Sequence, residues 1–445
     1  MRGLRSFLGL LAILVALGAY LYFVESKRTP GDDGETKPEV FTVEADAIDE
    51  ITIRSEAGDT TTLRKSNDEW TVVAPTAAPA DGAEISGIAT NLASLEEGRL
   101  IDENPSTLAD FGLDPARIEV AFKSGGTDHR LFIGGRTPTG ADVYARTAAS
   151  PKVFLIASYL DSTFNRSTFD LRDKSALRFD RDAADSMSLV TNGRSIRFQK
   201  AGGTWQLAEP ASTRSDEAAI EGLLAQLDGL QMRSVVAHEA EDPAKFGLDT
   251  PAATIRIGSG SSSAELLVGA TADEGQLYAR DAARPEIFTI DASLLEDLKK
   301  DAGEYRQKDL FDARAFNTTR VEITQGSGTL VFEKTAGKDA EGKDEVKWRR
   351  VSPSAGDVDA AKVESLLSAL TSARATTFVE KLPAGARQQA VIALRFDEGR
   401  GNERVTFYQS GDDGYALREG SQPGRIEASV LSDITRALGE LEQPQ

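Results

Sequence analysis

The chain has 445 residues, with 51 Lys or Arg against 71 Asp or Glu, which gives a formal net charge of −20. An excess of carboxylates repels phosphate backbones, so we expect no nucleic acid partner. The chain has no cysteine, which excludes disulfides, thiolate metal sites, thiol nucleophiles and a lipid-modified N-terminal cysteine. A hydrophobic content of 40% is ordinary for a folded protein.

An uncharged apolar stretch opens the sequence at residues 7–24. As a helix it would be roughly 27 Å long, about enough to cross a bilayer. Tyr20, Tyr22 and Phe23 near its end are typical of an interfacial aromatic belt. We therefore predict a transmembrane anchor over residues 1–24. The short basic N-terminus favours a single pass through the inner (cytoplasmic) membrane, with the N-terminus inside and the rest in the periplasm.

A cleaved signal peptide is the alternative, because Ala16-Leu17-Gly18 places small residues where a cleavage site needs them. Residues 25–40 combine Pro, Gly and charged residues, which indicates a flexible linker. Its root-mean-square reach would be about 20–25 Å.

The rest of the chain is an internal repeat. Trp70, Trp205 and Trp348 are the three tryptophans, and each is followed five residues later by a proline. The first two are 135 residues apart, and the same spacing separates Phe111 from Phe246. A constant period of this kind indicates tandem modules. We assign them to residues 41–175, 176–310 and 311–445, the third being divergent.

Each module begins with a predicted three-strand meander that ends at its tryptophan. The strands are separated by turn signals such as Asn192-Gly193. In the third module a charged insert over residues 337–347 lengthens the meander, and we predict a surface loop there.

An amphipathic helix follows each proline, because apolar residues recur there at steps of three and four. Asp81, Asp216 and Asp359 stand at the matching helix starts, where a carboxylate favours the N-terminal end. Further short strands and a short closing helix, near residues 159–164 in the first module, complete each unit. The predicted class is α+β, with three tandem repeats that each contain an antiparallel sheet, one packed helix and a short closing helix.

The Phe-Gly-Leu-Asp segments at Phe111 and Phe246 could form a binding loop. We favour a structural role in which Phe and Leu enter the core while Gly112 and Gly247 adopt a backbone conformation that other residues resist. The third module lacks this segment.

Tyr144, Tyr278 and Tyr415 recur in Tyr-Ala-Arg or Tyr-Ala-Leu-Arg sequences. Tyr and Arg on one strand face can bind carboxylates or sugars. A feature repeated in three modules is, however, more simply explained as a requirement of the fold. We treat these tyrosines, the three tryptophans and the two Phe-Gly pairs as structural repeat markers.

Catalytic, cofactor and metal signatures are not found in the sequence. The two histidines, His129 and His238, are interpreted as polar surface residues. We therefore predict no catalytic residues, no cofactor-binding or metal-binding residues, and no enzyme activity.

The order of anchor, Trp with a following Pro, helix, Phe-Gly-Leu-Asp and Tyr-Ala-Arg resembles the bacterial family called domain of unknown function 4340. The similarity covers residues from about 1 to 310 well and the remainder loosely. It implies membrane proteins encoded beside ABC-type permeases and gliding-motility auxiliary proteins, and it supplies no catalytic residue.

Two functions follow as hypotheses. The first is a membrane-tethered extracytoplasmic accessory or scaffold protein, whose partners are the membrane and ABC-type permease or auxiliary subunits. The alternative is a module that binds envelope glycans or peptides in a groove lined by the Tyr and Arg strand faces.

Overall fold

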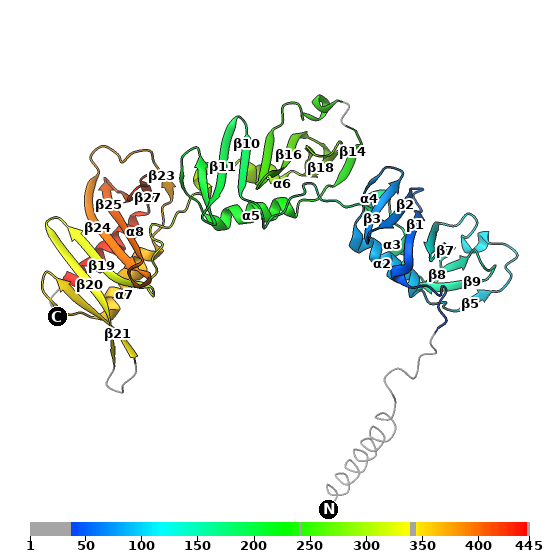
Figure 1. The fold of residues 1–445 in the computed structure, drawn as a ribbon, viewed down its shortest axis with the longest axis horizontal. Coiled ribbons are helices and arrows are strands. Elements are labelled where there is room, and N and C mark those ends of the chain that lie inside the picture. The colour runs from blue at the N-terminus through cyan, green and yellow to red at the C-terminus, as the bar shows by residue number, and fades with distance from the viewer. Residues whose placement is uncertain (1–36, 240–241, 339–343, 443–445) are drawn as a thin grey trace, which may run out of the picture. The chain divides into compact units, whose positions relative to one another are not determined.

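The computed structural model describes residues 37–239, 242–338 and 344–442. The chain divides into two compact units, Met1–Lys174 and Ser175–Gln445. The first unit carries one nine-stranded antiparallel sheet and the second carries two (Figure 1). The predicted α+β class with three repeats is confirmed. Each sheet with its helices is called a module below, numbered 1 to 3 in chain order.

The predicted transmembrane helix lies outside the described residues, as does most of the linker predicted for residues 25–40. Within the described ranges, no helix is long and apolar enough to cross a membrane. The last linker residues are described, and for them the prediction is wrong. The carbonyl of Pro38 accepts a hydrogen bond from the Glu97 amide at 2.8 Å, and the Val40 amide donates to the Leu95 carbonyl at 2.7 Å. Residues 38–40 are therefore part of module 1.

The three sheets have the same strand order, so each module repeats one topology. Module 1 contains β1 (Ile48–Arg54), β2 (Thr60–Ser66), β3 (Glu69–Ala74), β4 (Ala78–Pro79), β5 (Leu100–Asp102), β6 (Ile118–Ser124), β7 (Thr127–Arg136), β8 (Asp142–Thr147) and β9 (Val153–Ala157). Its helices are α2 (Gly82–Ala93), α3 (Tyr159–Phe164) and α4 (Thr168–Leu171), with short 3-10 turns η2 (Ala45–Ala47) and η3 (Ala109–Phe111).

Module 2 repeats this pattern. Its strands are β10 (Ser186–Thr191), β11 (Arg194–Ala201), β12 (Thr204–Glu209), β13 (Thr213–Arg214), β14 (Ser234–Ala237), β15 (Ala253–Ser259), β16 (Ser262–Thr271), β17 (Gln276–Asp281) and β18 (Ile287–Asp291). Its helices are α5 (Glu217–Asp228) and α6 (Ser293–Leu298), with 3-10 turns η4 (Pro243–Phe246), η5 (Asp273–Gly275) and η6 (Ala302–Tyr305).

Module 3 keeps the order, with longer strands β19, β20 and β21 and longer helices. Its strands are β19 (Thr318–Gln325), β20 (Gly328–Lys338), β21 (Asp344–Ser352), β22 (Gly356–Asp357), β23 (Thr377–Phe378), β24 (Arg387–Phe396), β25 (Gly401–Ser410), β26 (Asp413–Arg418) and β27 (Gly424–Ile426). Its helices are α7 (Ala360–Ser372) and α8 (Ala428–Glu442), with one 3-10 turn, η7 (Asp397–Gly399).

Two expectations for module 3 are wrong. In the described part of the charged insert, residues 337–338 and 344–347, strand replaces the predicted surface loop. Gly337 pairs with Glu345 and Lys338 with Asp344, so these residues lengthen the β20–β21 hairpin. The closing helix is not short either. It is the fifteen-residue α8, which contributes Leu431, Ile434 and further apolar residues to the core shared with α7.

Each main helix begins at the predicted aspartate. The side chains of Asp81, Asp216 and Asp359 accept hydrogen bonds from backbone amides of the first helical turn at 3.1, 3.2 and 2.9 Å. These bonds satisfy donors that the first helical turn leaves unpaired. The apolar face that follows is buried against the sheet: Ile85, Ile88 and Leu92 in α2, Ile220, Leu223 and Leu227 in α5, and Val363, Leu366 and Leu370 in α7.

The three tryptophans are buried in their modules, with exposed fractions of 8% for Trp70, 1% for Trp205 and 3% for Trp348. The indole of Trp205 donates to Glu221 Oε1 at 2.8 Å, and the Lys200 ammonium lies 4.9 Å from its ring centre. In module 2, helix α5 and the strands of the meander therefore contact each other at Trp205.

The strand-end glycines Gly134 and Gly269 are explained by the Phe-Gly-Leu segments. A Cβ on Gly134 would lie 2.2 Å from the carbonyl oxygen of Phe111, and a Cβ on Gly269 would lie 2.1 Å from that of Phe246. The loop can approach the strand only because these positions have no side chain. In module 3, which lacks the loop, the equivalent position is Tyr408, since it follows the residue that pairs with the alanine of Tyr-Ala.

Within the segments themselves, Gly112 and Gly247 have φ values of 67° and 68°, in the left-handed region that favours glycine. Leu113 and Leu248 are buried, with exposed fractions of 2% and 5%. The left-handed glycines and the buried leucines agree with the structural interpretation, whereas Phe111 and Phe246, expected in the core, are half-buried.

We predict that Trp205→Ala lowers the free energy of unfolding by about 3–5 kcal/mol, as for other buried aromatic residues. Urea denaturation followed by circular dichroism measures the loss. Trp70→Ala and Trp348→Ala should fall in the same range. A variant that keeps its stability but loses partner binding would show instead that its tryptophan belongs to a recognition surface.

Gly269→Ala should destabilise the protein by about 1–3 kcal/mol, because the added methyl overlaps the backbone oxygen of Phe246. The matched control is Gly222→Ala in α5, where no atom lies within 4 Å of the new Cβ. That change should stabilise the helix by about 0.5–1 kcal/mol. Equal effects of the two variants in thermal melts would contradict the close-approach explanation.

Candidate functional site

The repeated tyrosines are covered by the chain's own loops. The ring of Tyr144 packs edge-on against Phe111 with centroids 5.2 Å apart, and Tyr278 packs against Phe246 at 5.0 Å. Both tyrosines are half-buried, whereas Tyr415 is buried, with an exposed fraction of 7%.

The arginines of the same strand faces are engaged as well. The guanidinium of Arg146 lies over the ring of Phe132, 4.0 Å from its centre. In module 2, Arg280 Nε donates to the carbonyl of Arg284 at 3.1 Å. These Tyr and Arg side chains of modules 1 and 2 therefore contact groups of their own modules and remain half-buried.

The two histidines differ in environment. His238 is exposed, as predicted. His129 is half-buried, and the prediction of a polar surface residue is wrong for it. Its ring stacks on Phe122 with centroids 4.9 Å apart and meets the edge of Phe41 at 5.5 Å. Among the described residues, no group of three or more acidic, His or Cys side chains could hold a metal ion.

Hollows of ligand size in the described part of the chain include the following two. One of about 340 Å³ in module 2 is mainly apolar, with Leu189, Ile196 and Leu298 among its lining residues. The cations that line it, Arg194 and Lys300, are paired with Asp301 and Asp297. The other, of about 810 Å³ in module 1, is polar and includes Lys37 and Arg99.

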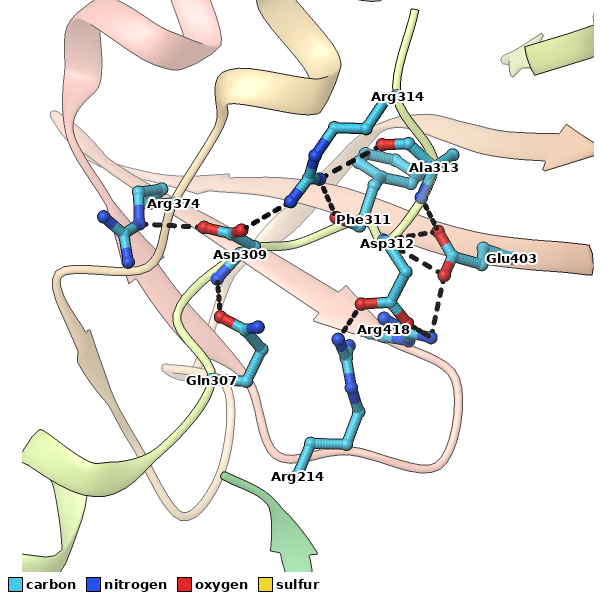
Figure 2. Close-up of polar contacts among 10 residues, drawn as sticks. All are labelled: Arg214, Gln307, Asp309, Phe311, Asp312, Ala313, Arg314, Arg374, Glu403 and Arg418. Carbon is cyan, nitrogen blue, oxygen red and sulfur yellow. Dashed lines mark hydrogen bonds and ion pairs between the residues drawn. The ribbon is translucent and has the colours of Figure 1, made fainter. Parts of the chain in front are cut away.

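Figure 2 shows a cluster of polar contacts where the chain passes from module 2 into module 3. Residues 306–314, called the connector here, run between η6 and β19. Arg306 forms an antiparallel bridge with Ser215 of module 2, and Asp309 forms one with Arg374 of module 3. The connector is thus held by backbone pairing within the Ser175–Gln445 unit.

Glu403 in β25 fixes the connector through its carboxylate. Its oxygens accept hydrogen bonds from the Asp312 amide at 2.9 and 3.1 Å and from the Ala313 amide at 3.2 Å. Arg418 Nη2 in β26 donates to Glu403 Oε1 at 3.0 Å. The side chain of Glu403 is only 3% exposed, so these partners replace its hydration.

The side chains of the connector continue the network (Figure 2). Asp312 is shared between Arg418, at 3.0 Å, and Arg214 of β13. Asp309 is shared between Arg314 at 3.1 Å and Arg374 at 2.9 Å. Charged groups of modules 2 and 3 are thereby joined through one connector carboxylate.

Burial, followed by the nearby positive charge of Arg418, lowers the pKa of the Arg214 guanidinium to about 10. Arg214 is therefore still charged at neutral pH. The Glu403 carboxylate accepts hydrogen bonds from two backbone amides and one guanidinium, and these bonds position the connector backbone. The geometry of this cluster therefore indicates a structural role.

Sequence reasoning did not single out Glu403. The register places it at the strand position held by His129 in module 1 and Ala264 in module 2, so the repeat gives no hint of a buried carboxylate.

Glu403→Ala should destabilise the protein by about 3–5 kcal/mol, because it leaves Arg418 without this partner and two buried amides without their acceptor. Arg436→Ala, which removes an exposed pair with Asp433 on α8, should change stability by less than about 1 kcal/mol. Chemical denaturation of both variants measures the difference. Similar small losses for the two would mean that Glu403 does not hold the connector.

No curated protein matches the sequence. Solved structures similar to the chain include two crystal structures of the DNA polymerase sliding clamp from Pseudomonas aeruginosa, one of them with ligand. They are 8% and 10% identical, cover 87% of this chain and 93% and 92% of the clamp chains, and have TM-scores of 0.17 and 0.15. Scores this low carry no conclusion about fold or function.

A family model described as "Domain of unknown function (DUF4340)" matches residues 70–204 and again residues 205–394. Each match begins at a repeat tryptophan, Trp70 or Trp205. Because the two matches cover more than half of the sequence, the chain belongs to the DUF4340 family.

Proposed function

We propose that the protein is a membrane-tethered extracytoplasmic accessory or scaffold protein that works by contact with other proteins and carries no catalytic activity. The observation that carries the proposal is the covering of the repeated Tyr and Arg strand faces. Phe111 and Phe246 pack against the tyrosine rings of their modules, and the Arg146 guanidinium lies over the ring of Phe132. These contacts within the modules support a structural role for the repeated residues.

The membrane attachment rests on the sequence of residues 7–24, which is uncharged and long enough to cross a bilayer. Module 1 begins at residue 38 by its backbone pairing, so about 13 residues separate it from the apolar stretch. Such a tether has a root-mean-square reach of about 20 Å. Module 1 would stay near the bilayer, where a high effective concentration strengthens weak contacts with membrane proteins.

The class of partner follows from the resemblance to the family. We propose an ABC-type export complex or a gliding-type envelope complex, with the permease or an auxiliary subunit as the contacting protein. The net charge of −20 agrees with a role that does not involve nucleic acid.

The test is gentle purification from native membranes after crosslinking, followed by identification of the captured proteins. We expect a permease or auxiliary subunit to accompany the full chain, and to remain when residues 1–24 are replaced by an unrelated membrane anchor. Carbonate extraction of the same membranes should leave the full chain in the pellet.

Two outcomes would contradict the proposal. Recovery of a soluble chain that starts near residue 19 would remove the anchor. Tight binding of a glycan or peptide by the exported part, lost in Arg146→Ala and Arg280→Ala without any transport partner, would favour the binding-module alternative.

A further inference from the structure

The mainly apolar hollow of module 2 lies between the β10–β11 hairpin and the segment from α6 to η6. Leu189 of β10 and Ile196 of β11, which are paired across the hairpin, line it from the sheet. Leu298 of α6 and Ala302 of η6 line it from the other segment. Its volume is about 340 Å³. All of its lining residues belong to module 2, so its shape does not depend on the other modules.

Module 1 has larger side chains at the equivalent place. The segment from α6 to η6 repeats the segment from α3 to α4 at a constant offset of 134 residues, from 164 to 298 and from 168 to 302. Phe164 therefore stands in module 1 where module 2 has Leu298, and Thr168 stands where module 2 has Ala302. Both differences remove side-chain atoms from module 2.

The sheet differs in the same way. The strand register places Ile196 of module 2 at the position of Thr61 in module 1. Thr61 is fully buried there, and its hydroxyl lies 2.7 Å from the hydroxyl of Thr168. Module 2 replaces this polar contact by Ile196 and Ala302, two apolar residues that line the hollow. The hollow is therefore a property of module 2 and not of the repeated topology.

The charged residues that line the hollow are two cations and one carboxylate, Arg194, Lys300 and Asp301. Arg194 is paired with Asp301, and their side chains are 58% and 76% exposed. Lys300 is paired with Asp297 and is 51% exposed. Exposed ion pairs contribute little stability, so a ligand anion can share these cations at small cost. The pair with Asp301 also shows that Arg194 accepts a carboxylate at this place.

We propose that this hollow binds a medium-chain fatty acid, with the alkyl chain against Leu189, Ile196 and Leu298 and the carboxylate at Arg194. A mainly apolar concave surface with a few polar groups is typical of a small-molecule site. A dry cavity of about 150 Å³ accepts benzene, so about 340 Å³ has room for an alkyl chain of about eight to ten carbons.

The choice of a carboxylate head follows from the charges. The planar guanidinium of Arg194 matches a planar carboxylate. A phosphate monoester carries more negative charge, which Asp301 beside it would repel. The site goes beyond the proposed scaffold function and does not rest on it.

The test measures binding of radiolabelled hexanoate, octanoate and decanoate to the full chain by equilibrium dialysis. The protein is held in lipid nanodiscs, because a detergent is itself an amphiphile that would compete for the hollow. Empty nanodiscs give the uptake by the bilayer, which is subtracted. We expect saturable binding whose affinity rises about three- to four-fold for each added methylene group up to about ten carbons. Octanol and octyltrimethylammonium, with neutral and cationic heads, should bind at least several-fold more weakly than octanoate.

Variants assign the binding to the hollow. Leu298→Phe introduces the residue that module 1 carries at this place, and Ala302→Leu adds volume from the other end of the segment. Each should weaken octanoate binding at least ten-fold. Ala244→Leu is the matched control, because Ala244 is exposed and does not line the hollow, and it should leave binding unchanged. Arg194→Gln should weaken octanoate several-fold and leave octanol unchanged.

The proposal is overturned if the wild-type chain takes up no octanoate beyond the empty nanodiscs, or if the two filling variants bind like the wild type. Equal binding of octanol and octanoate would also overturn it and would assign the hollow to an uncharged apolar group, such as a side chain of a partner protein. Tighter binding of octyl phosphate than of octanoate would refute the carboxylate head. Should Leu298→Phe fail to fold, Ala302→Leu keeps the test decisive, because Ala302 is only half-buried.

Discussion

In each module one backbone hydrogen bond joins the segment that enters the module to a residue one or two positions beyond the end of the main helix. A buried backbone carbonyl at this place needs a donor, and the helix itself does not supply one. The entering segment is extended, so it can supply an amide there and bury its next apolar side chain in the same step. The pairs are Val40 N to Leu95 O at 2.7 Å, Ala176 N to Leu230 O at 2.8 Å, and Leu310 N to Ala373 O at 3.1 Å.

Because this contact is made by the backbone, the side chains around it are free to differ between modules. The strand position beside the entering segment is His129 in module 1, Ala264 in module 2 and Glu403 in module 3. The histidine stacks with aromatic rings, and the glutamate binds connector amides. The same topology therefore accommodates a histidine, an alanine and a glutamate at equivalent strand positions.

Much of the fold could be predicted from the sequence, because its determinants are local and repeated. The cap at Asp216, the apolar face of α5 and the turn at Asn192-Gly193 are each specified by residues close together in the chain. The β20–β21 hairpin was missed because its charged residues are typical of a loop, whereas its strands are held by pairing with each other. The junction cluster was missed for a different reason. Glu403 lies 91 residues from Asp312, and no periodicity links them.

The repeat also separates what the fold requires from what it does not. In modules 1 and 2 the Phe-Gly-Leu loop recurs together with a glycine on the facing strand, whose missing side chain leaves room for the loop. The pairs are Phe111 with Gly134 and Phe246 with Gly269. Module 3 has lost the loop and carries Tyr408 at the glycine position, where it lies opposite Tyr415. The two changes belong together, since a side chain at that position excludes the loop. Features that recur or disappear in this coupled way are explained by packing.

The junction of modules 2 and 3 does not follow that rule. The ion-pair network of Arg214, Asp312, Arg418 and Glu403 is not repeated in the described parts of the other modules. The positions equivalent to Glu403 are His129 in module 1 and Ala264 in module 2, so the topology can form without this carboxylate. Buried charges are unfavourable unless paired, and their replacement by apolar residues is often neutral or stabilising. Stability alone therefore does not account for charges concentrated here. The paired groups position the connector between modules 2 and 3.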